Sequence, residues 1–169
     1  MFTLPDMPQD RALLELADRF SESEATSLRA FLAFLHVSAE TYEAYNVHFA
    51  RYGLSDGRFS LLIFLLTERE RVPTPSDCAE RLGVTRATVT GLLDGLEREG
   101  LIRREPRPGD GRMLAVRLTE QGQKLLEGML PDHFRRITAC TSHLTEIEKM
   151  LLISLVVRLR SGLPALSER

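Results

Sequence analysis

The sequence predicts a mostly α-helical fold with one small β-hairpin, and three patterns support this expectation. From Leu28 to Tyr52, apolar residues recur at steps of three, four and seven, which is typical of amphipathic helices. Five expected helices each follow a hydroxyl residue suited to cap the helix start, namely Ser55, Thr74, Thr85, Thr119 and Thr145. Two short runs around the loop RPGDGR are typical of paired strands instead.

Two helices are expected before the first of these caps. Residues 11–20 read as a short amphipathic helix, and residues 28–52 as a long helix with an aromatic-rich stripe. Gly53 is well placed to end the long helix as a C′ glycine. Ser55 then caps an apolar helix that begins DGRFSLLIFLL.

The next two helices are short and close together. Thr74 is the expected N-cap of the first, Pro75 fits its first helical position, and Gly83 ends it. Thr85 caps the second, which runs to Gly100 and turns a stripe toward the core, made of Val89, Leu92, Leu93 and Leu96. A connection of about three residues that includes a glycine is typical of a helix-turn-helix.

A β-hairpin follows directly, with strands at 101–106 and 113–119. Alternation places Leu114, Val116 and Leu118 on one face and Ala115 and Arg117 on the other. A helix-turn-helix followed by a hairpin is a winged helix-turn-helix. Its second helix enters the major groove of DNA, and the hairpin tip reaches into the neighbouring minor groove.

Thr119 caps a helix that runs toward Pro131, beyond which the helical pattern resumes. Thr145 caps a last helix with nine apolar positions, at 147, 150–153, 155–157 and 159. That stripe is too wide for a helix with one free face. It predicts dimerisation of two copies; the alternative is that the helix is buried within its own subunit.

Composition favours an ordinary globular protein of 169 residues, 43% hydrophobic and 27% charged. No apolar run approaches a membrane span, and no signal peptide is visible, so we expect a cytoplasmic protein with no membrane partner. Cys78 and Cys140 lack metal-type spacing and read as reduced thiols. Catalytic motifs are also missing, so neither an enzyme nor a cofactor or metal is expected.

Charge is unevenly distributed along the chain. Residues 81–117 hold eight arginines and five acids, a net charge of +3, whereas residues 1–27 carry −4. A basic middle in a chain of net charge −2 predicts a local footprint for a polyanion.

Residues 81–122 resemble the MarR family of bacterial transcription regulators. The resemblance is strongest in VTRATVTGLLDGLEREGLI and in DGRMLAVRLTEQG, which matches an Asp-x-Arg, short strand, Leu-Thr pattern. It implies a homodimeric repressor of a palindromic double-stranded operator, and in many members a small aromatic or phenolic acid releases the DNA. The expected domains are 1–53 (dimerisation and a pocket wall), 54–120 (the DNA-binding lobe) and 121–169 (dimerisation).

Arg86, at the start of the second helix, is the strongest candidate for a base contact, and Arg112 would place its charge in the narrow minor groove. The expected DNA-binding residues are Thr74, Ser76, Thr85, Arg86, Ala87, Thr88, Thr90, Gly91, Arg107, Asp110, Gly111 and Arg112. Arg103 and Arg104 either hold phosphates or pair with acids such as Glu97 or Glu99.

An effector pocket would use the aromatic stripe, with Arg58 pairing the carboxylate of the acid. The expected lining is Tyr45, His48, Phe49, Arg58 and Phe59; the alternative is that these rings are plain core. Two other functions stay open. One is a winged-helix protein–protein interaction module without DNA binding, and the other is a regulator that senses thiol oxidation through Cys78.

Overall fold

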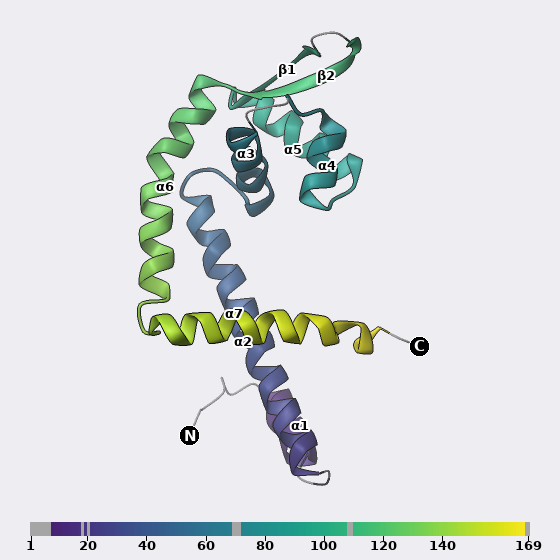
Figure 1. Ribbon diagram of the computed structural model, residues 1–169, viewed down its shortest axis with the longest axis vertical. Helices are drawn as coiled ribbons and strands as arrows, with labels where there is room; N and C mark the ends of the chain where they lie inside the picture. Colours follow the sequence, from purple (N-terminus) through teal and green to yellow (C-terminus); the bar gives the residue numbers. More distant parts are fainter. Residues whose placement is uncertain (1–7, 18, 20, 69–71, 108–109, 168–169) are drawn as a thin grey trace.

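The computed structural model describes residues 8–17, 19, 21–68, 72–107 and 110–167, and side chains at 8–11, 107 and 110–113 lie outside that description. A helical chain with one hairpin results, as predicted (Figure 1). Its elements are α1 (Pro8–Ala17), α2 (Glu22–Ala50), α3 (Asp56–Thr67), α4 (Pro75–Leu82), α5 (Arg86–Arg98), β1 (Ile102–Arg107), β2 (Asp110–Leu118), α6 (Glu120–Cys140), α7 (Glu146–Gly162) and the 3-10 turn η1 (Leu163–Leu166).

The five predicted caps are confirmed, because each hydroxyl accepts a hydrogen bond from the backbone N–H three residues later. The long helix α2 begins at Glu22, six residues before the predicted start. Ser21 caps it, and Glu24 completes a reciprocal capping box. The missed signal is the Ser-x-x-Glu spacing at 21–24, which precedes the apolar stripe.

Helices α3 to α5 and the hairpin form a winged lobe, which we define as residues 56–118 (Figure 1). Its core receives fully buried side chains from every layer, with Leu61 and Leu62 from α3, Leu93 and Leu96 from α5, and Ile102 from β1. The end of α2 and the start of α6 also reach this core, through Phe49, Leu126 and Met129. The lobe is therefore joined to both long helices by apolar packing.

Strands β1 and β2 pair antiparallel, with Ile102 opposite Leu118 and Arg104 opposite Val116. The predicted apolar face of the hairpin is buried only near the hairpin root. Val116 is buried, but Leu114 is 47% exposed and Ala115 on the other face is buried. The reason is that the lobe core covers the root, whereas Leu114 lies further out along the strand.

Helix α6 continues without interruption through Pro131. A proline inside a helix removes one backbone hydrogen bond. Here both Pro131 and Glu127, whose carbonyl loses that bond, are exposed. Solvent can replace the missing donor, so the helical pattern on the two sides of Pro131 forms one helix.

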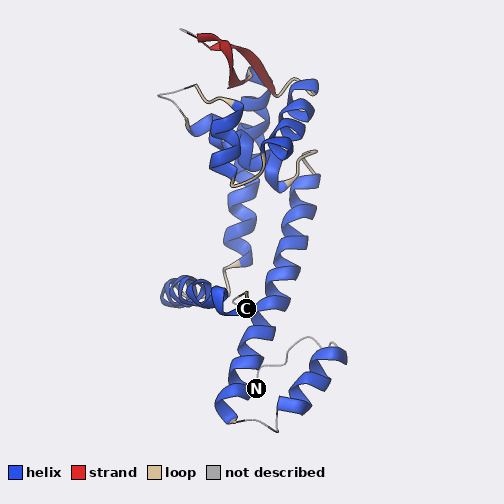
Figure 2. Ribbon diagram, turned by 90° about the vertical axis from the view of Figure 1, so that its right-hand side faces the viewer, coloured by secondary structure: helices blue, strands red, loops and turns tan. Residues whose placement is uncertain are grey.

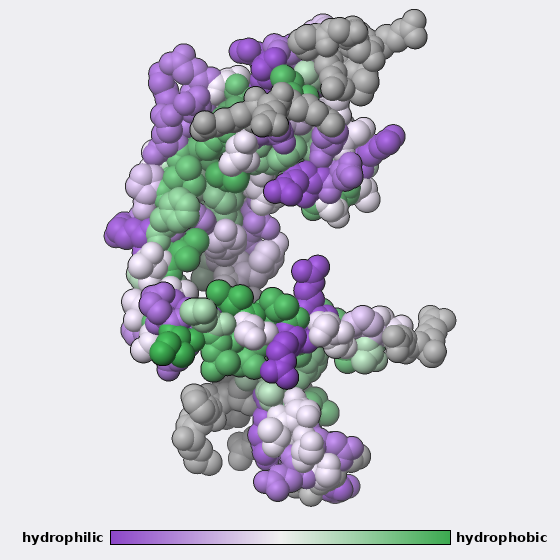
Figure 3. All heavy atoms as spheres, in the orientation of Figure 1, coloured by the Kyte–Doolittle hydropathy of each residue, from purple (hydrophilic) through white to green (hydrophobic). Residues whose placement is uncertain are grey.

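Helix α7 lies across the lower part of the molecule, away from the winged lobe (Figures 1 and 2). None of its residues is buried, and apolar side chains gather along the face of α7 that Figure 3 shows. Exposed fractions reach 80% at Ile147, 71% at Met150 and 64% at Ile153. Burial within its own subunit, the alternative that the sequence left open, is therefore wrong for this helix. Among the described residues, none of the helices combines the length and apolar content needed to cross a membrane.

Candidate nucleic-acid interface

The start of α5 presents a polar face on the outside of the winged lobe. Val89 and Leu93 turn into the core, whereas the predicted contact residues on this helix are all exposed: Thr85, Arg86, Ala87, Thr88, Thr90 and Gly91. The division follows the helical period, since the apolar residues fall on one side and the small and polar residues on the other. This face is free to meet another molecule.

Hydrogen bonds order the polar side chains on that face. The Thr85 hydroxyl caps α5 by accepting the Thr88 N–H, and the two hydroxyls lie 2.8 Å apart. Thr90 donates its hydroxyl proton to the Arg86 carbonyl. Arg86 itself makes no ion pair within the described part of the chain. Its charge lies beside the positive end of the helix dipole, so this end of α5 favours an anion.

The start of α4 offers Ser76 rather than Thr74. Thr74 is 4% exposed, and both its N–H and its hydroxyl donate to Asp77 Oδ2 at 2.8 Å. Thr74 is thus occupied by its capping box. Ser76 is exposed at the first turn of the same helix and remains the residue of the pair that a phosphate can reach.

Four predicted contact residues lie toward the end of the hairpin. The backbone of Arg107, Asp110, Gly111 and Arg112 belongs to β1 and β2, which project beyond helices α3 to α5 (Figure 1). Their side chains, and all of Pro108 and Gly109, lie outside the described part of the structure.

The arginines nearer the root of the hairpin are paired with acids. Arg104 contacts Glu97 and Asp94 on α5, and Arg103 and Arg117 both contact Glu105. The hydrogen bonds from Arg104 lower the pKa of Glu97, and those from Arg117 lower the pKa of Glu105. Acid pairing, the second of the two roles considered for Arg103 and Arg104, is therefore the one observed.

The predicted ligand-lining rings pack on one another where α2 meets α6. Phe49 lies 4.4 Å from Tyr45 and 4.6 Å from Phe59 between ring centroids, and Phe49, Phe59 and His48 are buried. His133, which is not among the predicted lining residues, joins this cluster, with its Nδ1 3.1 Å from His48 Nε2. No spacing could have identified that pair, because 85 residues separate the two histidines.

The Arg58 side chain is already paired with other groups of the protein. It forms an ion pair with Glu99 at the end of α5, and it donates a hydrogen bond of 2.9 Å to the Gly53 carbonyl. A carboxylate ligand would have to displace Glu99 from the guanidinium.

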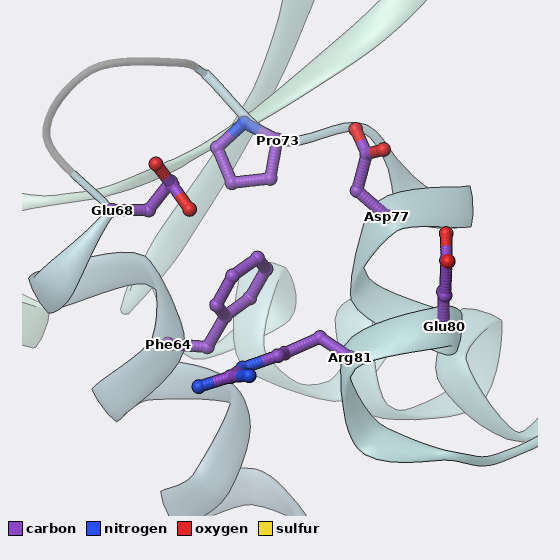
Figure 4. A pocket seen from close by; sticks show the side chains of 6 residues that line it. All are labelled: Phe64, Glu68, Pro73, Asp77, Glu80 and Arg81. Carbon is purple, nitrogen blue, oxygen red and sulfur yellow. The ribbon is translucent and has the colours of Figure 1, made fainter.

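A cavity of about 390 Å³ opens between α3 and α4, away from all five predicted ligand residues (Figure 4). Phe64 forms its floor, and Arg81 lies 6.0 Å from the centroid of that ring. Three carboxylates, those of Glu68, Asp77 and Glu80, surround the opening. Their charge disfavours an aromatic acid in this cavity.

Cys78 is fully buried in the lobe core. Burial raises the pKa of its thiol to about 11. The reactive form in thiol oxidation is the thiolate, so this environment opposes the redox role that the sequence left open for Cys78.

Comparison with known proteins agrees with this geometry. A sequence model of the MarR family matches residues 52–113. The HTH-type transcriptional repressor YetL of Bacillus subtilis is 33% identical over 153 residues, which cover 90% of this chain and 92% of YetL. The DNA complex of Staphylococcus aureus MepR superposes with a TM-score of 0.65 at 25% identity, over 78% of this chain and 94% of MepR. PcaV of Streptomyces coelicolor, solved with its natural ligand, shares the fold at 21% identity and a TM-score of 0.63, over 75% and 91% of the two chains.

Proposed function

Because this chain belongs to the MarR family of DNA-binding transcriptional regulators, we propose that it is a homodimeric repressor of a palindromic operator. The observation that carries the proposal is the exposed start of α5, where Arg86 stands without an acidic partner in the described structure. The other face of the same helix is locked into the core by Val89, Leu93 and Leu96. Such a helix can enter the major groove without losing its own packing.

Each subunit would contact DNA at three places. The start of α5 supplies Arg86 to a base edge and Thr88 and Thr90 to the groove wall, with Thr85, Ala87 and Gly91 alongside. Ser76 supplies a phosphate contact, with Thr74 holding the helix start in place. The hairpin tip, with Arg107, Asp110, Gly111 and Arg112, would follow the minor groove.

The homodimer is supported by α7. A helix with this much exposed apolar surface needs a partner, because patches of that size on soluble proteins mark interaction surfaces. Two-fold symmetry would present two α5 helices to the DNA about one helical turn apart, and this predicts a palindromic site.

Repression and release form the last part of the proposal. YetL, similar over nearly its whole length, is named a repressor. We place the effector, a small aromatic or phenolic acid, at the aromatic cluster of Tyr45, His48, Phe49 and Phe59. That cluster joins the long helices to the winged lobe, so a ligand there changes the placement of α5. Arg58 would bind the carboxylate only by exchanging its Glu99 partner.

Fluorescence anisotropy with duplex DNA from upstream of the protein's own gene tests the proposal. We expect tight binding that weakens steeply with salt, and a salt slope that becomes shallower by about one for each phosphate that a variant no longer binds. Arg86→Ala should lower affinity for the operator, whereas Arg135→Ala, on the exposed side of α6, should not. A panel of aromatic acids in the same plates tests release. If neither the upstream DNA nor a random duplex binds at low salt, the protein is not a DNA-binding repressor and the alternative of a protein-interaction module takes its place.

A further inference from the structure

Both strands of the hairpin are hydrogen-bonded to neighbouring elements at the same position along the sheet. Arg104 and Val116 lie opposite each other in the register of β1 and β2. The Arg104 N–H donates to Glu97 Oε1 at 2.9 Å, and the Val116 N–H donates to the Pro73 carbonyl at 2.8 Å. In an antiparallel pair, residues that do not bond to each other turn their amides outward. The outward N–H groups of Arg104 and Val116 therefore both donate hydrogen bonds to other parts of the winged lobe.

At the β1 edge, the Arg104 side chain strengthens the attachment to α5. Its Nε lies 2.9 Å from Glu97 Oε2, and its Nη2 lies 2.6 Å from the same oxygen and 2.5 Å from Asp94 Oδ1. Asp94 and Glu97 are three residues apart and so lie on one face of α5. The guanidinium thus spans two carboxylates on the second half of the helix, and only 21% of its side chain is exposed.

At the β2 edge, the attachment leads to α4. Pro73 directly precedes Thr74, the N-cap whose capping box with Asp77 fixes the first turn of α4. The hairpin is therefore attached to both helices of the helix-turn-helix. The two attachments lie toward the root of the hairpin, at Arg104 and Val116.

We propose that Arg104 is a positioning residue for DNA binding, which fixes the angle of the wing relative to α5 and does not itself touch the DNA. The inference rests on the proposed function and names the residue that sets the spacing between the two groove contacts. Glu97 is its main partner, because it accepts hydrogen bonds from both the backbone and the side chain of Arg104. Without the contacts of Arg104 with α5, the hairpin would pivot about its root. The hairpin tip and α5 would then no longer fit the two DNA grooves at once.

Arg103 provides a matched control. It is the neighbouring residue on β1 and carries the same charge, but its side chain is 60% exposed and pairs with Glu105 inside the hairpin. Arg104→Ala and Arg103→Ala each remove one positive charge from adjacent positions. Only the first removes the link to α5.

The experiment measures operator affinity and its salt dependence for both variants, well below their melting temperatures. We expect Arg104→Ala to weaken operator binding about tenfold, in line with the loss of hydrogen bonds to charged groups, while the slope of log affinity against log salt stays unchanged. Arg103→Ala should stay within about twofold of the wild type. Arg104→Lys, which keeps the charge but not the fork of donors, should recover only part of the affinity.

A double-mutant cycle with Glu97→Ala identifies the partner. If the contacts of Arg104 with α5 set the wing angle, Glu97→Ala weakens operator binding although it removes a negative charge, and the double variant is no weaker than Arg104→Ala alone. The inference is wrong if Arg104→Ala flattens the salt slope by about one per subunit and adds to Glu97→Ala, because Arg104 would then contact a phosphate. Equal effects of Arg103→Ala and Arg104→Ala would overturn it as well.

Hydrogen exchange in the free protein separates this inference from the proposed function. The Arg104 amide should exchange faster in Glu97→Ala than in the wild type, because its acceptor is gone. An unchanged exchange rate of the Arg104 amide would overturn the inference that Glu97 holds this strand, whether or not the protein binds DNA. A wild type that binds no DNA would instead overturn the proposed function, together with the role of Arg104 in it.

Discussion

Gly122 determines how closely α6 packs against the root of the wing. It is buried in the first turn of α6, where the Thr119 hydroxyl accepts its N–H at 3.1 Å and donates to the Gly100 carbonyl at 2.7 Å. A Cβ at this position would overlap the Leu101 carbonyl oxygen and lie 2.8 Å from Leu118 Cδ1. A glycine is required here by the close approach of two backbones and not by an unusual φ angle.

Gly122→Ala should lower the free energy of unfolding by about 1–3 kcal/mol or more, because a carbonyl oxygen cannot move aside as a flexible side chain does. Gly128→Ala, two turns along the same helix, should raise it by about 0.5–1 kcal/mol, since a Cβ there meets no atom within 4 Å. Urea unfolding of both variants and the wild type measures the two changes in the free energy of unfolding, which should have opposite signs. A neutral Gly122→Ala would mean that α6 is free to move away from the hairpin.

At the scale of elements, the junction of α2 and α6 contains a buried pair of histidines. His48 and His133 are 8% and 5% exposed, and burial lowers the pKa of both side chains. The charged groups that face the pair are Asp132 and Arg136 on α6 and Arg51 at the end of α2, and the Tyr52 hydroxyl donates to Asp132. Arg136 holds the pKa of Asp132 well below its usual range, so Asp132 stays ionised beside the neutral pair.

The pair should make stability fall as the solution becomes mildly acidic. In the unfolded chain both histidines take up a proton near their ordinary pKa of about 6.5, whereas in the folded protein they do so only at lower pH. The contribution of the histidine pair to folding stability is therefore fully present above about pH 6.5 and is lost as the pH falls below that value. We expect Tm to drop between about pH 7.5 and 5.5, and His133→Phe to reduce that drop by roughly half, because it removes one of the two groups.

His143→Gln is the control for that measurement, because His143 lies exposed after the end of α6. It should leave the dependence of Tm on pH unchanged. If His133→Phe follows the wild-type curve, other groups cause the acid sensitivity and the histidine pair does not.

The distance along the chain between contacting residues explains what the sequence could predict. Caps, helix ends and the hairpin depend on residues within a few positions of one another, so Thr85 and Gly83 were recognisable from their neighbours alone. The contacts of Arg58 with Glu99 and of His48 with His133 join residues 41 and 85 positions apart. Local spacing carries no trace of such pairs. For this reason the sequence indicates neither the Glu99 partner of Arg58 nor the contact of His133 with His48.

At the scale of the whole molecule, the exposed apolar surface of α7 is the surface through which we propose that two copies assemble. Ile153→Glu would place a charge in the middle of that surface, where the proposed homodimer must bury it, and a buried unpaired charge costs several kcal/mol. We expect this variant to change from dimer to monomer in light scattering after size exclusion, and operator affinity to fall with it.

Gln123→Glu adds the same charge to the exposed side of α6 and should leave the mass unchanged. A dimeric Ile153→Glu would indicate that another surface holds the two copies together. A wild type that is monomeric at micromolar concentration would contradict the homodimer itself.

The length of α2 also makes the molecule a lever. Its 29 residues extend about 44 Å at 1.5 Å per residue, from the region of α1 to the aromatic cluster beneath the winged lobe (Figure 1). A tilt of only about 5° at the far end would swing the lobe by nearly 4 Å, which exceeds the 3.4 Å between successive bases of one strand. If the protein recognises an operator as proposed, recognition would tolerate very little bending, because a disturbance too small to unfold any element would be enough to move α5 by a full base step.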